Sequence, residues 1–129
     1  MMAPFRGGLG MRVLVADDDP IILRLLEVNL GLEGFVVETA GRGEDAVARA
    51  REARPDVIIL DVMMPGMTGY DVAARLKEYP GTAGIPVVFL SARTQDEDRA
   101  RGRELAAAYV TKPFDPGELV DIVRRLATA

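Results

Sequence analysis

Polar residues follow four of the short apolar runs in the chain, and they are the residues whose types could do chemistry. Asp17 and Asp18 follow the first run, Asp61 follows the third, and Lys112 follows the fifth. Ser91, which follows the fourth run, adds a hydroxyl group. Carboxylates are ligands for a hard cation such as Mg²⁺, and a carboxylate can also act as a nucleophile. If these positions converge, they predict a site for phosphoryl transfer, which depends on positioning and on neutralising the charge of the phosphoryl oxygens.

Such a cluster of carboxylates needs positive charge beside it. Three carboxylates at close range repel one another and raise one another's pKa values. Mg²⁺ suits this environment, and Lys112 would supply a second positive charge from the other side of the site. Met63 lies two residues beyond Asp61, where its backbone carbonyl could complete the metal shell. The hydroxyl of Ser91 could donate to a phosphoryl oxygen.

The absence of two residue types narrows the chemistry further. The chain contains neither cysteine nor histidine, which excludes disulfides, thiolate metal sites and every mechanism that needs an imidazole. The net charge of -4 provides no basic surface for nucleic acid. No apolar run approaches the roughly 20 residues that a membrane helix requires. The lack of cysteine fits a reducing cytoplasm, which is the expected location.

The length of 129 residues predicts a single domain. Residues 1–10 are rich in glycine and show no strand or helix pattern, so we expect a flexible extension or an expression remnant there. Met11 immediately precedes the first apolar run and is a candidate native start. The domain itself is expected to cover residues 11–129.

Apolar runs of strand length alternate with amphipathic segments of helix length along the whole domain. Strands are expected at residues 13–16, 35–40, 57–60, 86–90 and 108–111, and helices at residues 20–30, 44–54, 70–79, 96–106 and 116–126. Strict alternation predicts an α/β fold with a five-stranded parallel sheet, doubly wound and covered by five helices. In the flavodoxin-like strand order 2-1-3-4-5, strands one and three are neighbours. Asp17, Asp18 and Asp61 would then meet at the carboxyl end of the sheet.

Four segments of the chain resemble the receiver domain of two-component response regulators, including the chemotaxis regulators. They are VLVADDDP at residues 13–20, DVMMPGMTG at 61–69, VVFLSA at 87–92 and YVTKPF at 109–114. Each segment alone is a weak signal, but the four in this order and spacing are specific. The resemblance covers residues 11–127.

The resemblance implies a role for each residue of the predicted site. Asp61 would be the phosphoacceptor, which receives a phosphoryl group from a histidine kinase or a histidine phosphotransfer protein and becomes an aspartyl phosphate. Asp18 would bind Mg²⁺ directly and Asp17 through water or in a supporting role. Asp61 and the carbonyl of Met63 would be the further metal ligands. Lys112 would contact the phosphoryl group.

The resemblance also implies a switch. Ser91 would be the switch hydroxyl and Tyr109 the switch aromatic, which turns inward when Ser91 moves towards the phosphate. The Lys112–Pro113 peptide would be cis. Phosphorylation would then change the face formed by the fourth helix, the fifth strand and the fifth helix, and so control an output domain, a partner or a homodimer. Direct binding of nucleic acid or a membrane by this domain is not expected.

Two departures from the family pattern affect these expectations. The turn before the switch aromatic reads Leu105-Ala106-Ala107-Ala108, one residue short and without a glycine, which affects the geometry of the output face. The positions that tune hydrolysis in the family hold Met63 and Arg93, and neither obviously orients an attacking water. We therefore hypothesise slow autodephosphorylation.

Other readings of the same residues remain open at this point. The chain could be an aspartate-nucleophile phosphatase of the haloacid dehalogenase type, but Met63 occupies the place where that family carries a second aspartate. It could also be a receiver-like binding module that is never phosphorylated, although no expected acidic residue or lysine is missing. Asp17 to Asp19 could merely cap a helix, and Tyr109 could merely pack. The favoured hypothesis is a signalling domain that catalyses no reaction besides its own phosphorylation and dephosphorylation.

Overall fold

Five parallel strands form one sheet in the order β2-β1-β3-β4-β5, as the sequence predicts. The structure is a computed structural model, and the residues that it describes are 10–92 and 105–128. The strands are β1 (Arg12–Ala16), β2 (Val36–Ala40), β3 (Val57–Asp61), β4 (Val87–Ser91) and β5 (Ala108–Thr111). Strand β3 lies at the centre and is buried along its whole length, which explains its continuous run of apolar residues.

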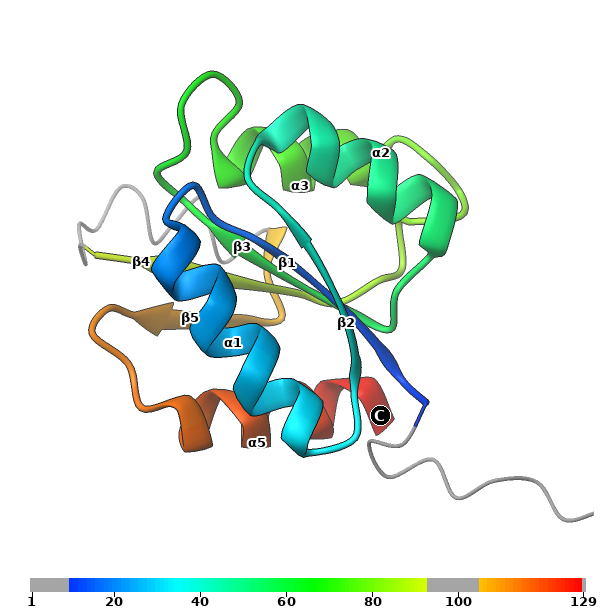
Figure 1. The fold of residues 1–129 in the computed structure, drawn as a ribbon. Coiled ribbons are helices and arrows are strands. Elements are labelled where there is room, and N and C mark those ends of the chain that lie inside the picture. The colour runs from blue at the N-terminus through cyan, green and yellow to red at the C-terminus, as the bar shows by residue number, and fades with distance from the viewer. Residues whose placement is uncertain (1–9, 93–104, 129) are drawn as a thin grey trace, which may run out of the picture.

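Helices cover both faces of this sheet (Figure 1). The helices of the described residues are α1 (Pro20–Leu32), α2 (Gly43–Ala53), α3 (Gly69–Lys77) and α5 (Pro116–Thr128). Helices α2 and α3 lie over one face, and α1 and α5 lie over the other. Of the predicted fourth helix at 96–106, only residues 105 and 106 belong to the described part of the chain. The arrangement confirms the doubly wound α/β fold.

Alternate residues of the central strands pack against opposite helix layers. Ile58 and Leu60 of β3 belong to the core on the α2 and α3 side, together with Phe89 of β4. Ile59 of the same strand and Leu90 of β4 belong to the core on the α1 and α5 side. Because successive side chains of a strand point to opposite faces, a strand buried on both faces must be apolar at every position. The two cores hold the strand ends in place, and the polar residues follow at those ends.

Helix α1 begins as predicted and ends two residues later than predicted. The side chain of Asp19 accepts a hydrogen bond from the backbone N–H of Ile21 and caps the helix, with Pro20 in its first turn. The helix runs through Gly31 to Leu32. The chain reverses instead at Gly34, whose φ of 94° lies in the left-handed region that favours glycine.

Helix α3 begins with a capping box immediately after the loop that follows Asp61. The hydroxyl of Thr68 accepts from the N–H of Asp71, and the carboxylate of Asp71 accepts from the N–H of Thr68. This reciprocal pair satisfies two donors that the first helical turn leaves free, and it fixes where the loop ends. Within the described residues, no helix has the length and apolar character needed to span a membrane.

Candidate functional site

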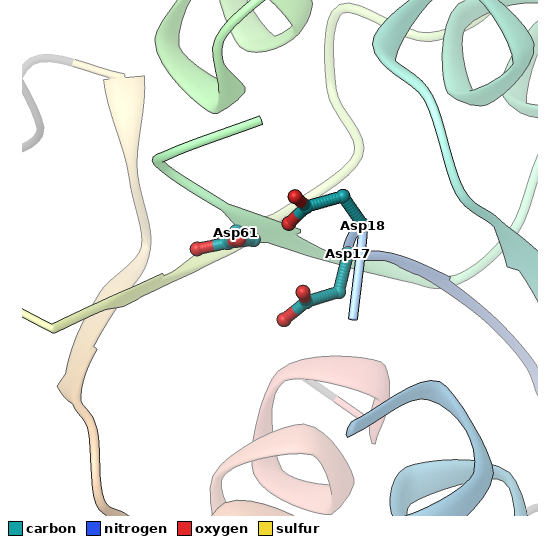
Figure 2. A group of neighbouring side chains, drawn as sticks. All are labelled: Asp17, Asp18 and Asp61. Carbon is teal, nitrogen blue, oxygen red and sulfur yellow. The ribbon is translucent and has the colours of Figure 1, made fainter. Parts of the chain in front are cut away.

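Asp17, Asp18 and Asp61 meet at the carboxyl ends of β1 and β3. Ala16 pairs with Leu60 across the two neighbouring strands, so the residues that follow them emerge side by side. One carboxylate oxygen from each aspartate lies within 4.8 Å of the others. Figure 2 shows the three side chains projecting from the two strand ends into the same region. The predicted convergence is therefore confirmed.

The three carboxylates differ in their surroundings. Asp17 is fully buried, and both of its oxygens have partners: Oδ2 accepts from Lys112 Nζ at 3.0 Å, and Oδ1 accepts from the Asp19 N–H at 2.9 Å. Asp61 is only 4% exposed. Asp18, by contrast, is exposed to solvent. An entering cation would therefore reach the carboxylate of Asp18 first, while Asp17 is held by the protein.

Lys112 reaches the site from the residue that follows β5. Its Nζ atom lies 3.4 Å from Oδ1 of Asp61 in addition to its contact with Asp17. Its backbone N–H donates to the carbonyl of Ser91 at 2.7 Å, and the Lys112–Pro113 peptide is cis, as expected. Burial by itself lowers the pKa of this ammonium, but the hydrogen bond with Asp17 and the charge of Asp61 outweigh burial and raise the pKa above its ordinary value. Lys112 is therefore a permanent positive charge in the site.

The carboxyl group of Asp61 has a raised pKa. Burial raises its pKa, and the negative charge of Asp17 raises it further. The charge of Lys112 and the N–H of Met63, which donates to Oδ1 at 3.3 Å, act in the opposite direction. The net result is a pKa of about 6. A bound cation would favour the ionised carboxylate, since the two opposite charges attract.

The residues present fit a divalent metal ion. Among the residues that the structure describes, three carboxylates surround the site against one ammonium, so these residues alone leave the cluster with excess negative charge. The side-chain donors of this cluster are oxygen atoms, which suit a hard cation such as Mg²⁺ or Mn²⁺ rather than a metal that prefers nitrogen or sulfur. The exposed position of Asp18 leaves a path from solvent to the cluster.

The other predicted residues lie at or near this edge of the sheet. Ser91 is the last residue of β4, the strand beside β3, and it is buried. Met63 follows Asp61 by two residues, and its side chain is 69% exposed. The short turn before β5 is formed by Ala106 and Ala107. The N–H of Ala107 donates to the carbonyl of Val87 at 2.8 Å. Arg93 lies outside the described residues.

Tyr109 has a partner that the sequence did not reveal. Its hydroxyl lies 2.8 Å from the hydroxyl of Tyr70, in the first turn of α3, and either group can donate. The ring of Phe89 packs against both tyrosine rings in T-shaped geometry, at centroid distances of 4.8 Å to Tyr70 and 6.1 Å to Tyr109. In the sequence, Tyr70 is an aromatic residue in an amphipathic helix, which predicts packing and gives no signal of a polar partner on a distant strand.

Comparison with known proteins agrees with the geometry. The model of the response regulator receiver domain family matches residues 13–124. The DNA-binding response regulator MtrA of Mycolicibacterium smegmatis is 45% identical over 114 residues, which are 88% of this chain and 49% of that protein. The chain thus spans about half the length of this curated relative.

Solved structures show the same fold. The chemotaxis protein CheY4 of Vibrio cholerae superposes with a TM-score of 0.86 at 34% identity, covering 91% of this chain and 98% of that chain. The receiver domain of a sensor histidine kinase from Pseudomonas aeruginosa, solved with a magnesium ion coordinated in its active site cleft, has a TM-score of 0.85 at 26% identity. This match covers 93% of this chain and 99% of that chain. The chain belongs to the receiver domains of two-component response regulators.

Proposed function

We propose that Asp61 accepts a phosphoryl group from a phosphohistidine of a histidine kinase or phosphotransfer protein. The observation that carries this proposal is the grouping of a buried Asp61 with Asp18 on one side and Lys112 on the other, at the carboxyl end of the sheet. The donor must be a separate protein or domain, because this chain contains no histidine. The proposed place of action is the cytoplasm, which the absence of cysteine fits.

In the proposed reaction, Asp61 and Lys112 have separate roles. An ionised oxygen of Asp61 attacks phosphorus, and the P–N bond of the phosphohistidine breaks, with its electron pair leaving on the imidazole. Lys112 neutralises charge on the phosphoryl oxygens, which is the main requirement of this kind of transfer. With a pKa of about 6, Asp61 is mostly ionised at neutral pH and so is available as the nucleophile.

Asp18, Asp61 and the backbone carbonyl of Met63 would hold Mg²⁺, with Asp17 in a supporting role. When bound, the ion would supply positive charge to the phosphoryl oxygens and to the carboxylate cluster. The two protein contacts of Asp17 support its secondary role, because they leave Asp18 as the more accessible ligand. The receiver domain of the Pseudomonas aeruginosa sensor histidine kinase, solved with a magnesium ion in its active site cleft, supports the choice of ion.

Phosphorylation would act as a signal that is read elsewhere. In this proposal, Ser91 and Tyr109 respond to the phosphoryl group and alter the surface around β5 and α5. Because MtrA is a DNA-binding response regulator of about twice the length of this chain, a DNA-binding output domain is a candidate for what reads the signal. A separate partner or a homodimer through the same surface is the alternative.

The proposal includes slow autodephosphorylation. The side chain of Met63 is 69% exposed next to Asp61, and a thioether neither donates a proton nor strongly orients water. A phosphorylated chain that loses its phosphoryl group within seconds at room temperature would contradict this part of the proposal.

Incubation with a small acyl phosphate and Mg²⁺, followed by intact-mass measurement, tests the proposed function. We expect a stable adduct with the mass of one phosphoryl group, and no adduct in the Asp61→Asn variant. The exposed Asp45 of α2 provides the control, since Asp45→Asn should be phosphorylated like the parent chain. Hydrolysis of the acyl phosphate without an adduct would indicate a phosphatase, and no reaction at all would indicate a binding module.

A further inference from the structure

Three aromatic side chains connect α3 to the last strand of the sheet. Tyr70 in the first turn of α3 is only 4% exposed, and its ring packs against that of Phe89 on β4 in T-shaped geometry. Phe89 in turn packs against Tyr109 on β5, which is half-buried. The hydroxyls of the two tyrosines meet at 2.8 Å. The hydrogen bond therefore joins the helix α3 to β5, the strand at the edge of the sheet.

The start of α3 also lies directly on the backbone of the proposed phosphoacceptor. A Cβ atom added to Gly69 would stand 2.4 Å from the carbonyl oxygen of Asp61, so only a glycine permits this approach. The N–H of Gly69 donates to the carbonyl of Val62 at 3.0 Å. The backbone of Asp61 thus packs closely against Gly69, the residue that precedes Tyr70.

We propose that Tyr70 is a positioning residue that holds the ring of Tyr109 against Phe89 and couples the backbone of Asp61 to β5. This inference rests on the proposed function, in which Tyr109 is the switch aromatic. It adds a connection that runs along α3, separate from the one through Ser91 and β4. This connection has three steps: the contact of Asp61 with Gly69, the covalent bond from Gly69 to Tyr70, and the hydrogen bond between the hydroxyls of Tyr70 and Tyr109.

The hydroxyl pair favours one orientation of the Tyr109 ring. If this ring turned towards solvent, the buried hydroxyl of Tyr70 would lose its hydrogen bond with Tyr109, whereas the Tyr109 hydroxyl could bind water. A net hydrogen bond of ordinary strength changes such an equilibrium by about fivefold. Removing the Tyr70 hydroxyl should therefore increase the solvent-facing population of Tyr109 by about fivefold.

Fluorine NMR of the chain labelled with 3-fluorotyrosine measures this population. The chain has three tyrosines and no tryptophan, so three resonances are expected, and single Tyr→Phe variants assign them. We expect Tyr70→Phe to increase the solvent isotope shift of the Tyr109 resonance between H₂O and D₂O, which reports exposure of the ring. Tyr79→Phe is the matched control, because Tyr79 packs under the guanidinium of Arg51 and should leave Tyr109 unchanged.

A double-mutant cycle tests whether the two hydroxyls share a hydrogen bond, and the isotope shift of Tyr109 reports the orientation that this bond favours. The loss of unfolding free energy caused by Tyr70→Phe should be smaller in the Tyr109→Phe background, because the shared hydrogen bond is already absent there. An unchanged isotope shift of Tyr109, or equal losses in the two backgrounds, would overturn the inference. Both measurements use the unphosphorylated chain, so they test Tyr70 even if the parent chain forms no phosphoryl adduct; that separate result would reject the proposed function.

Discussion

The Nζ atom of Lys112 lies 3.0 Å from Oδ2 of Asp17, a carboxylate that has no exposed surface. The other oxygen of Asp17 accepts the backbone N–H of Asp19, so the protein itself satisfies this buried charge on both sides. A buried carboxylate that loses its cation is costly, because the remaining charge stays out of reach of water. Lys112 is thus expected to stabilise the fold as well as to contact the phosphoryl group.

Replacing Lys112 tests this dual role. We expect Lys112→Gln to lower the free energy of unfolding by about 2 kcal/mol, less than for a fully buried pair because the lysine side chain is 21% exposed. Urea denaturation without divalent ions measures the change. Lys77, the other lysine of the chain, is exposed and provides the control: Lys77→Gln should change stability by no more than about 0.5 kcal/mol. Equal losses for the two variants would argue against a buried Asp17–Lys112 pair.

The raised pKa of Asp61 predicts a pH dependence of stability without divalent ions. The folded chain holds this proton up to a pKa of about 6, whereas the ordinary value is 3.8. Between these two values the folded state binds more protons than the unfolded state, so the contribution of Asp61 is fully present below the lower value and lost as the pH rises through the upper one. The loss is on the order of 3 kcal/mol.

The variant Asp61→Asn isolates this contribution from other titrating groups. The stability difference between Asp61→Asn and the parent chain should grow in favour of the variant as the pH rises from about 4 to about 6. Asp45→Asn, at an exposed position of α2, should follow the parent chain over the same range. Thermal denaturation across this range measures both, and a pH-independent difference for Asp61→Asn would contradict the raised pKa.

Mg²⁺ binding should depend on Asp18 and not on its neighbour Asp19. Loss of an outer-shell partner of a metal typically weakens binding tenfold or more, so loss of a direct ligand in Asp18→Asn should weaken it by at least about tenfold. Asp19→Asn should bind Mg²⁺ like the parent, because Asp19 caps α1 through the N–H of Ile21 and asparagine caps a helix equally well. Isothermal titration calorimetry at neutral pH compares the three chains. Weaker binding by Asp19→Asn alone would reverse the proposed assignment.

The different surroundings of Gly69 and Gly31 predict opposite effects on stability when each is replaced by alanine. In Gly69→Ala the new Cβ would meet the Asp61 carbonyl oxygen at 2.4 Å, so the backbone must shift, and we expect a loss of about 2 kcal/mol together with slower phosphorylation. In Gly31→Ala, within α1, a Cβ would find no atom within 4 Å, and we expect a gain of about 0.5 kcal/mol. Urea denaturation and the acyl phosphate assay check both, and a Gly69→Ala chain as stable and as reactive as the parent would contradict the contact.

Much of the site could be predicted from the sequence because its residues stand where apolar runs stop. The run before Asp61 is too apolar to be anything but a central strand, and the carboxyl ends of neighbouring parallel strands share one edge. The meeting of Asp61 with Asp17 follows from the strand order, because β1 and β3 are neighbours. Lys112 follows β5, which β4 separates from β3, and its long side chain reaches both carboxylates.

The rest depends on contacts between residues that carry no local signal. The pairing of Tyr70 with Tyr109 needs the exact lateral position of α3 on the sheet, which periodicity does not report. Helix α1 runs through Gly31 to Leu32, because a glycine in the last turn of a helix carries only a small penalty. The pKa of Asp61 combines burial with two opposing charges, and each depends on distance.

The long separation of Asp17 and Lys112 along the chain has a consequence during protein synthesis. These residues are 95 positions apart, and the lysine follows the last strand of the sheet. A ribosome therefore synthesises Asp17, which follows β1, and Asp61, which ends β3, well before the lysine whose ammonium compensates them. A nascent chain interrupted before β5 would carry Asp61, the proposed phosphoacceptor, without its cationic partner Lys112, so we expect an unfinished translation product to accept no phosphoryl group.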